Sequence, residues 1–473
     1  MIFQLQDLIL GEGSFVFSGE VRAVAHPCLN QAITKEFWYN FSFQASTLCV
    51  SACDDLCFSI GNAEKYPLDG RAWSVSVEPD GICVCAKDEK SLLDGYMTLL
   101  DRFSAIDLAD GSLGVEIPCC RFREDTPFSV RMVHYCIFPE TELWELQRFV
   151  RFCGALKYTH IVLEFWGMLK YDCMKELSWQ NGFTKDEVKP IIQEAHDLGL
   201  EVIPMFNHWG HASACRGLNA KHVVLDQNPT RQTYFSEEGW CWDIRKDKVK
   251  ALLGEIRKEL IELCGEGSYF HLGCDEAYGF EMNEENMTML CNFINEIDDE
   301  LREQGRRAII WGDMMLYQKA EYNPNNRYCC HAPSPDIAPF MLARLNRHIV
   351  IADWEYHAKE APIETEAIFR EAGFDCLLCP WDDGREPMNA VLQTVREKQL
   401  MGFMHTTWHT LHYGMACVAF GAASGWQETY LPDEEHRWDT LEEPAALLRK
   451  LNFVRGNYEQ AGWAPKQTGM GLA

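Results

Sequence analysis

The segment KVKALLGEIRKELIELCGEGSYFHLG (residues 248–273) contains the unit from which the fold can be inferred. Its first part places apolar residues at three- and four-residue spacing and ends near Gly265, a pattern that predicts an amphipathic helix. Its second part, YFHLG (269–273), is a short apolar run with aromatic residues, which is typical of a buried strand. A helix that leads directly into a buried strand is the repeating unit of α/β folds.

The same unit recurs from about residue 128 onward. Strands are expected at 128–135, 159–165, 200–206, 269–273, 307–313, 348–354, 374–380 and 402–408, and amphipathic helices at 140–156, 185–199, 248–265 and 286–305. Eight strands that alternate with helices predict a closed (β/α)8 TIM barrel. An open doubly wound sheet would carry a glycine-rich turn after its first strand, and RMVHYCIFPE (131–140) has no glycine.

The segments outside this alternation suggest two further parts. Residues 1–125 contain strand-like pieces and one amphipathic helix at 89–104, which indicates a small α/β domain ahead of the barrel. The barrel is expected to span residues 126–430. Residues 431–473 contain LEEPAALLRKLNFVRGNYEQ (441–460), which predicts a helical tail packed on the barrel.

Charge and composition narrow the class of partner. The 473 residues carry a formal net charge of −28, which repels the phosphate backbone of nucleic acids and anionic lipid surfaces. No apolar run approaches the length of a membrane span. Neither nucleic acid nor a membrane is therefore expected as a partner, and a neutral substrate fits better.

The location is expected to be cytoplasmic. The first residues, MIFQLQDLILGEGSF (1–15), lack the basic start and long apolar core of a signal peptide. The 21 cysteines contain no zinc-type pair of C-x-x-C motifs, and their number is odd. We interpret them as mostly buried thiols of a reducing compartment.

The active site of a TIM barrel is built at the carboxyl ends of its strands. Polar and aromatic residues stand at these ends: Arg131, His134, Glu164, Trp166, Asn207, His208, His211, Asp275, Glu276, Tyr278, Trp311, Asp313, Trp354, Tyr356, Trp381, Trp408 and His409. Four of them are tryptophans at the ends of the last four strands. Aromatic walls with a few carboxylates fit the apolar faces and hydroxyl rim of a sugar ring, and the alternative is that these tryptophans fill the barrel top as core.

Asp275 and Glu276 stand side by side where the fourth strand stops. Alternation along a strand would point the two side chains to opposite faces, so both can face one pocket only if the strand ends there. Two adjacent carboxyls in an apolar site have their pKa values pushed apart, which allows one to stay protonated. The alternative is a solvated acidic pair at the start of a loop.

Two segments near the third and fourth strands resemble a known family. HLGCDE (271–276) resembles the H-x-G-G-D-E signature of family 20 glycoside hydrolases, the β-N-acetylhexosaminidases, with Cys274 in place of the second glycine. VIPMFNHWGHASA (202–214) is similar to the third-strand segment of that family and keeps Pro204, Gly210 and His211. Met205 and Asn207 replace the acidic residues that are usual there, which leaves the sugar preference open.

Other segments extend the resemblance over about residues 85–420. The first barrel strand carries Arg131 where the family has an arginine that grips ring hydroxyls, and WGDMM (311–315) is similar to the fifth-strand segment. The closest similarity is to the intracellular hexosaminidase D type.

The resemblance implies a mechanism in which the 2-acetamido group of the substrate is the nucleophile. Glu276 is then the general acid and base, and Asp275 orients the acetamido group. The residues expected to contact the substrate are Arg131, His211, Trp311, Asp313, Trp354, Tyr356, Trp381 and Trp408. No cofactor is expected, and no metal, because HWGH (208–211) lacks the one-face helical spacing of metalloprotease ligands.

The sequence thus predicts a retaining exo-β-N-acetylhexosaminidase that removes terminal β-linked GalNAc or GlcNAc from a small oligosaccharide or glycoconjugate. The alternative is a non-catalytic relative that binds N-acetylhexosamines, and a metal-dependent barrel hydrolase is a third hypothesis. The sequence is also compatible with a homodimer.

Overall fold

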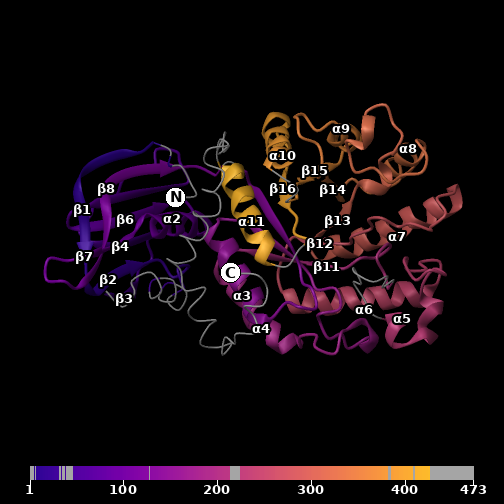
Figure 1. Cartoon of the computed structure of the whole chain (residues 1–473), viewed down its shortest axis with the longest axis horizontal. Helices are drawn as coiled ribbons and strands as arrows, with labels where there is room; N and C mark the ends of the chain where they lie inside the picture. The colour runs from indigo at the N-terminus through magenta and orange to yellow at the C-terminus, as the bar shows by residue number, and fades with distance from the viewer. Residues whose placement is uncertain are drawn as a thin grey trace.

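The chain forms a small sheet domain followed by a barrel (Figure 1). The computed structural model describes residues 5, 7–30, 34, 38, 46–126, 128–213, 224–381, 385–408 and 411–426. In Figure 1 the small domain lies on the left in indigo and purple, and the barrel lies on the right. Helix α11 (Leu411–Trp426) lies between them.

The small domain is a twisted sheet with helix α2 packed against it. Its elements are β1 (Ile9–Phe17), β2 (Gly19–Ala25), β3 (Ser46–Ala52), β4 (Cys57–Gly61), β5 (Trp73–Glu78), β6 (Gly81–Ala86), α2 (Glu89–Arg102), β7 (Ser104–Asp107) and β8 (Leu113–Glu124). The strand order is β1-β8-β5-β6-β4-β2-β3, with β7 paired to β8. Helix α2 begins at the N-cap Asp88, whose side chain accepts the backbone N–H of Ser91. It packs against β4, β5 and β6.

The barrel contains the eight strands that the sequence predicts. They are β9 (Val130–Cys136), β10 (His160–Glu164), β11 (Glu201–Met205), β12 (Tyr269–His271), β13 (Arg307–Trp311), β14 (Val350–Trp354), β15 (Asp375–Cys379) and β16 (Gly402–His405). All neighbouring pairs are parallel, and β16 pairs with β9 to close the barrel. The predicted fold class is therefore confirmed.

Helices cover the outside of the barrel, and one follows each strand. They are α3 (Leu143–Ala155), α4 (Lys185–Asp197), α6 (Asp247–Cys264), α7 (Glu284–Glu303), α8 (Ile337–Leu342), α9 (Thr365–Glu371), α10 (Arg385–Lys398) and α11. The loops contain α5 (Val224–Gln227) and the 3-10 turns η1 (Lys175–Leu177), η2 (Pro229–Tyr234), η3 (Asp313–Met315) and η4 (Pro324–Asn326). Helix α6 ends as its sequence predicts, because Gly265 adopts a φ of 74° that glycine accommodates readily.

The inside of the barrel is a packed apolar core rather than a channel. It is filled by Val130, Met132, Val162, Ile203, Met205, Tyr269, Ile309, Trp311, Val350, Ala352, Leu377, Cys379 and Met404. Because these side chains fill the interior, a ligand can enter only above them, at the carboxyl ends of the strands.

Three other expectations concern the whole chain. No helix among the described residues is long and apolar enough to cross a membrane. The cysteines in the described ranges are free thiols, and most are buried. The predicted helical tail at 431–473 lies outside the described residues.

Candidate active site

A cavity of about 240 Å³ opens at the carboxyl end of the barrel. It is lined by Phe138, Trp166, His211, Asp275, Glu276, Trp311, Trp354, Tyr356 and Trp408. These residues come from the ends of seven strands and the loops after them, so the barrel itself brings them together.

The turn after β12 directs both acidic side chains into this cavity. The strand ends at His271, and Gly273, Cys274 and Glu276 then adopt positive φ angles of 69°, 75° and 43°. Such angles break the alternation of a strand, which allows Asp275 and Glu276 to face the same space. A Cβ atom on Gly273 would come within 2.5 Å of the Asn207 side-chain nitrogen, so the close approach of this turn requires glycine.

One histidine lies between the two carboxyls. His211 Nε2 is 3.2 Å from Asp275 Oδ2 and 3.1 Å from Glu276 Oε2. The second oxygen of Asp275 accepts a hydrogen bond from Asn207 Nδ2 at 2.7 Å. The second oxygen of Glu276 accepts the Tyr278 hydroxyl at 2.9 Å. Each acid is thus held from two sides.

These contacts set the protonation of Glu276. Burial raises the pKa of this carboxyl, but the hydrogen bond and charge of His211 lower it, and the net effect is a lowered pKa. The charge of Asp275 acts in the opposite direction, and the Tyr278 hydroxyl assists His211. The pKa of Tyr278 is raised by its own burial and by the charge of Glu276, so it stays protonated and acts as a donor.

A buried carboxylate supports the turn from behind. Asp313 Oδ2 accepts the backbone N–H of Glu276 at 3.0 Å and lies 2.9 Å from His331 Nδ1. Burial raises the pKa of Asp313. The pKa of His331 is raised on balance, because its hydrogen bond to Asp313 and the nearby carboxylates outweigh its burial. Asp313 therefore positions Glu276 through the main chain.

The remaining walls of the cavity are aromatic. The rings of Trp354 and Tyr356 lie 4.7 Å apart, and those of Trp311 and Trp408 lie 6.3 Å apart. Tyr356 Oη accepts a hydrogen bond from Trp408 Nε1 at 2.8 Å, which fixes the tyrosine hydroxyl at the cavity wall. Such a cavity can surround the apolar faces of a sugar ring while the acids reach its polar edge.

A comparison with protein families identifies the barrel. Residues 162–380, which include both acids, match the model of the glycosyl hydrolase family 20 catalytic domain. Residues 162–380 thus form a glycosyl hydrolase family 20 catalytic domain. The family expected from the sequence is confirmed, and with it the enzyme class of glycoside hydrolases.

The similar proteins share little sequence identity with this chain. A lacto-N-biosidase from Bifidobacterium bifidum is 22% identical over 334 residues, which cover 66% of this chain but only 28% of that protein's length. Among solved structures, an exo-β-N-acetylglucosaminidase from Vibrio harveyi shares 15% identity with a TM-score of 0.67, over 96% of this chain and 77% of that one. A β-N-acetylhexosaminidase from Bacteroides fragilis shares 15% identity with a TM-score of 0.64, over 97% and 95%. At this identity the structures show that the fold is shared.

Most of the residues predicted for the family 20 site line the cavity. The structure brings together Asp275, Glu276, His211, Trp311, Trp354, Tyr356 and Trp408. Two predicted substrate contacts stand one layer behind this wall. Asp313 is buried beneath Glu276, as described above, and Trp381 packs against the Tyr356 ring at 5.3 Å.

The predicted substrate contact of Arg131 is wrong, because this side chain lies at the opposite end of its strand. Arg131 is the second residue of β9, and it is buried against the small domain. Its guanidinium pairs with Asp94 of α2 at 3.1 Å and donates to the carbonyls of Phe128 and Lys157. Arg131 therefore joins the small domain to the barrel.

The family 20 site also has a wall residue, Phe138, that the sequence did not single out. Phe138 lies two residues beyond β9 and packs against the ring of Trp166 at 5.0 Å. Asn207 was noted at a strand end and as a departure from the family pattern, and the structure shows that its amide donates to Asp275. No sequence pattern would have identified Phe138, because it follows its strand without a motif.

The other histidines near the site have structural partners. His208 is buried with its Nδ1 2.6 Å from the carbonyl of Phe206, and burial lowers its pKa well below the usual value. The ring of His271 packs against Trp311, and its Nδ1 accepts the N–H of Gly273 at 3.0 Å. In the part of the chain that the structure describes, no group of three or more possible ligands is arranged to hold a metal ion.

Proposed function

We propose that the protein is a retaining exo-β-N-acetylhexosaminidase that releases terminal β-linked GalNAc or GlcNAc. The observation that carries this proposal is the placement of Asp275 and Glu276, which lie on one side of an aromatic cavity and share one histidine nitrogen. Glycosidases with two catalytic carboxylates place them on either side of the scissile bond. Two acids on one side support a mechanism in which the substrate supplies the nucleophile.

The first step is attack by the acetamido oxygen on the anomeric carbon. The bond to the leaving oxygen breaks, and Glu276 donates a proton to that oxygen. Positive charge develops on the acetamido group as the oxazoline ring forms, and the carboxylate of Asp275 stabilises this charge. Asn207 holds Asp275 in position at 2.7 Å. The Tyr356 hydroxyl, fixed by Trp408, is placed at the cavity wall to donate to the acetamido oxygen.

In the second step water replaces the acetamido oxygen. Glu276, now ionised, accepts a proton from that water, and the sugar leaves with its original anomeric configuration. The lowered pKa of Glu276 suits this step because it favours the ionised form. His211 accounts for most of this lowering. It therefore sets how readily Glu276 donates a proton in the first step and accepts one in the second.

The size of the cavity supports action on a terminal sugar. Sites for drug-sized ligands usually measure about 300–1,000 Å³. The present cavity measures about 240 Å³ and has aromatic side chains around it, which suits one pyranose ring and no more. A terminal residue can enter such a cavity, whereas an internal residue of a chain would need a groove open at both ends.

The experiment is hydrolysis of chromogenic N-acetyl-β-glucosaminides and N-acetyl-β-galactosaminides, with and without a chelator. Hydrolysis that resists chelation supports the proposal, and comparison of the two epimers gives the sugar preference. Binding of the sugar without any turnover would instead identify a non-catalytic relative, and loss of turnover on chelation would identify a metal-dependent enzyme.

We also propose a cytoplasmic location. This is supported by the free thiols, which include the adjacent pairs Cys119/Cys120 and Cys329/Cys330, because such thiols persist in a reducing compartment.

A further inference from the structure

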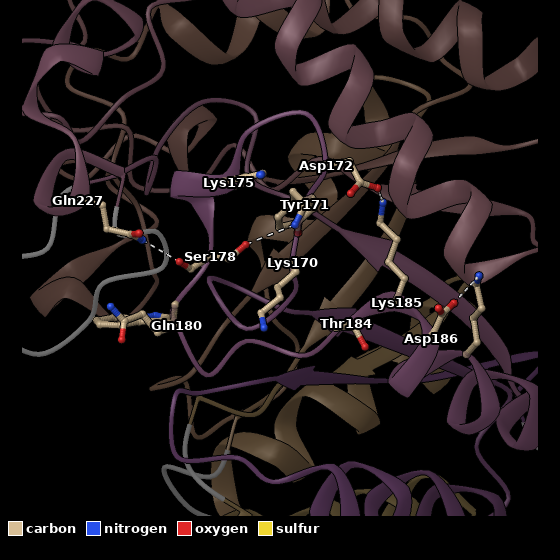
Figure 2. A pocket seen from close by; sticks show the side chains of 12 residues that line it. Lys170, Tyr171, Asp172, Lys175, Ser178, Gln180, Thr184, Lys185, Asp186 and Gln227 are labelled. Atoms are coloured by element: carbon tan, nitrogen blue, oxygen red, sulfur yellow. Dashed lines mark hydrogen bonds and ion pairs between the residues drawn. The ribbon is translucent and has the colours of Figure 1, made fainter.

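A second cavity, of about 680 Å³, is built mainly from the loop after β10 (Figure 2). It is lined by Lys170, Tyr171, Asp172, Lys175, Ser178, Trp179, Gln180, Thr184, Lys185, Asp186, Lys189 and Gln227. Most of these residues belong to the loop between β10 and α4, and Gln227 comes from α5. Both segments follow the carboxyl ends of barrel strands, so this cavity opens on the side of the molecule that holds Asp275 and Glu276.

Four lysines surround this cavity, and two of them have carboxylate partners. Lys185 pairs with Asp172 at 2.6 Å and with Glu259 at 2.7 Å. Lys189 pairs with Asp186 at 3.1 Å. Figure 2 draws the pairs with Asp172 and Asp186 as dashed lines.

The other two lysines are Lys170 and Lys175, and both are exposed at the cavity. Within the described ranges of the chain, neither ammonium group has an ion pair or a hydrogen bond, and Figure 2 draws none. A chain with a net charge of −28 repels anions from most of its surface. Lys170 interacts electrostatically with Glu187, but neither lysine is held in an ion pair, so the two ammonium groups mark a local site for a negatively charged group.

The rest of the lining suits a sugar rather than a bare anion. Trp179 is partly exposed, and its backbone N–H donates to the carbonyl of Gly167 at 2.7 Å. A Cβ atom on Gly167 would come within 2.5 Å of the Trp179 ring, so the ring is packed tightly against the loop. Gln227 Nε2 donates to the carbonyl of Ser178 at 2.7 Å and fixes the opposite wall. An aromatic face beside amides and hydroxyls is the usual composition of a carbohydrate site.

The loop also connects this cavity to the active site. Trp166 lines the active-site cavity, and Lys170 lines the second cavity four residues later. Four residues span at most about 14 Å when fully extended. An oligosaccharide whose terminal sugar occupies the first cavity can therefore extend into the second.

We propose that this second cavity, the lysine cavity, binds an acidic saccharide whose sulfate or carboxylate group pairs with Lys170 and Lys175 while a sugar ring packs on Trp179. The acidic saccharide is the leaving-group part of the substrate, and this second statement rests on the proposed function. The volume exceeds what a bare anion would fill, and the net charge of −28 disfavours a polyanion as large as a nucleic acid.

The binding test uses probes that have no terminal N-acetylhexosamine, so that its outcome is independent of hydrolysis. The affinities of 3′-sulfolactose, 3′-sialyllactose, lactose and sodium sulfate are measured by calorimetry on the full chain. We expect both acidic probes to bind about tenfold more tightly than lactose, the scale of two exposed charge pairs. The double variant Lys170→Ala/Lys175→Ala should lose this difference.

A matched control removes two exposed lysines elsewhere, Lys319→Ala/Lys398→Ala, and should keep the preference for acidic probes. Equal binding of lactose and the acidic probes would overturn the proposal, and so would an equal loss in the control variant. Sodium sulfate that binds as tightly as 3′-sulfolactose would overturn the assignment of a saccharide.

The kinetic test asks whether the two cavities act on one substrate. A terminal β-N-acetylhexosamine linked to sulfated lactose should have a KM about tenfold lower than the same trisaccharide without sulfate. The double lysine variant should raise this KM alone and leave kcat unchanged. Equal KM values with intact binding would overturn the leaving-group assignment. Failure of the proposed function would show separately, as loss of hydrolysis of neutral chromogenic substrates.

Discussion

Replacement of Asp275 by asparagine removes a negative charge from the active-site cavity and keeps the shape of the side chain. Asp275 is only 6% exposed, so little solvent screens its charge. One of its oxygens accepts from Asn207 at 2.7 Å, and the amide oxygen of asparagine can keep this bond. The side chain should therefore stay in place while its interaction with positive charge on the substrate is lost.

The size of the effect follows from the position of the carboxylate. Two opposite unit charges about 4 Å apart interact by about 4 kcal/mol at an effective dielectric constant of about 20. Removal of a single group that stabilises transition-state charge usually costs about 2.7–4 kcal/mol. We therefore expect Asp275→Asn to lower kcat by about 10²- to 10³-fold, with little change in the affinity for the sugar.

The assay is steady-state hydrolysis of a chromogenic N-acetylhexosaminide, together with inhibition by a thiazoline that mimics the cyclised sugar. The thiazoline should bind the native protein much more tightly than the parent sugar does, and this advantage should disappear in the variant. Asp243 provides a matched control, because it is also 6% exposed and lies outside the cavity. Asp243→Asn should cost stability and leave kcat unchanged.

Two results would refute this account of Asp275. One is a raised KM with an unchanged kcat, which would mean that Asp275 binds the substrate and the transition state equally well. The other is a thiazoline that binds the native protein no better than the parent sugar, which would exclude the acetamido group as nucleophile. The alkaline limb of kcat/KM gives an independent check. It should move to lower pH in the variant, because the charge of Asp275 raises the pKa of Glu276.

Three further predictions concern Glu276, His211 and Arg131. Glu276→Gln should lower kcat by about 10²-fold or more on poor leaving groups and much less on a leaving group that departs without protonation; an equal loss on both would argue against its role as the acid. His211→Asn should move the alkaline limb of kcat/KM to higher pH, because the acid must be protonated and His211 lowers the pKa of Glu276; an unmoved limb would contradict this. Arg131→Met breaks the buried ion pair with Asp94 and should lower the free energy of unfolding, measured in urea, by about 3–5 kcal/mol. A raised KM in the folded variant would instead indicate that Arg131 contacts the substrate.

The barrel could be predicted from the sequence because each strand is an apolar run with a helix after it. YFHLG (269–273) is such a run, and β12 (Tyr269–His271) lies within it. The turn at Asp275 and Glu276 could also be inferred, since two adjacent acids can share a pocket only where a strand ends. The structure shows how the chain turns there: a series of residues with positive φ angles follows the strand and ends at Glu276.

The sequence did not predict the contacts that join segments far apart in the chain. Arg131 stands on a barrel strand, but its partner Asp94 lies on a helix of the other domain, and no local pattern connects the two. His331 lies in an irregular loop, so its contact with Asp313 has no periodic signal. Asn207 departs from the family pattern, and only the structure shows that its amide contacts Asp275.

The central claim is that the acetamido group of the substrate attacks the anomeric carbon while Asp275 stabilises the charge. The most direct test is kcat/KM for a series of chromogenic substrates whose acetyl group carries zero, one, two or three fluorine atoms. Fluorine withdraws electrons from the carbonyl oxygen and weakens it as a nucleophile, so kcat/KM should fall steeply and steadily along the series. Values that stay constant from the acetyl to the trifluoroacetyl substrate would contradict the claim and would indicate a nucleophile supplied by the protein.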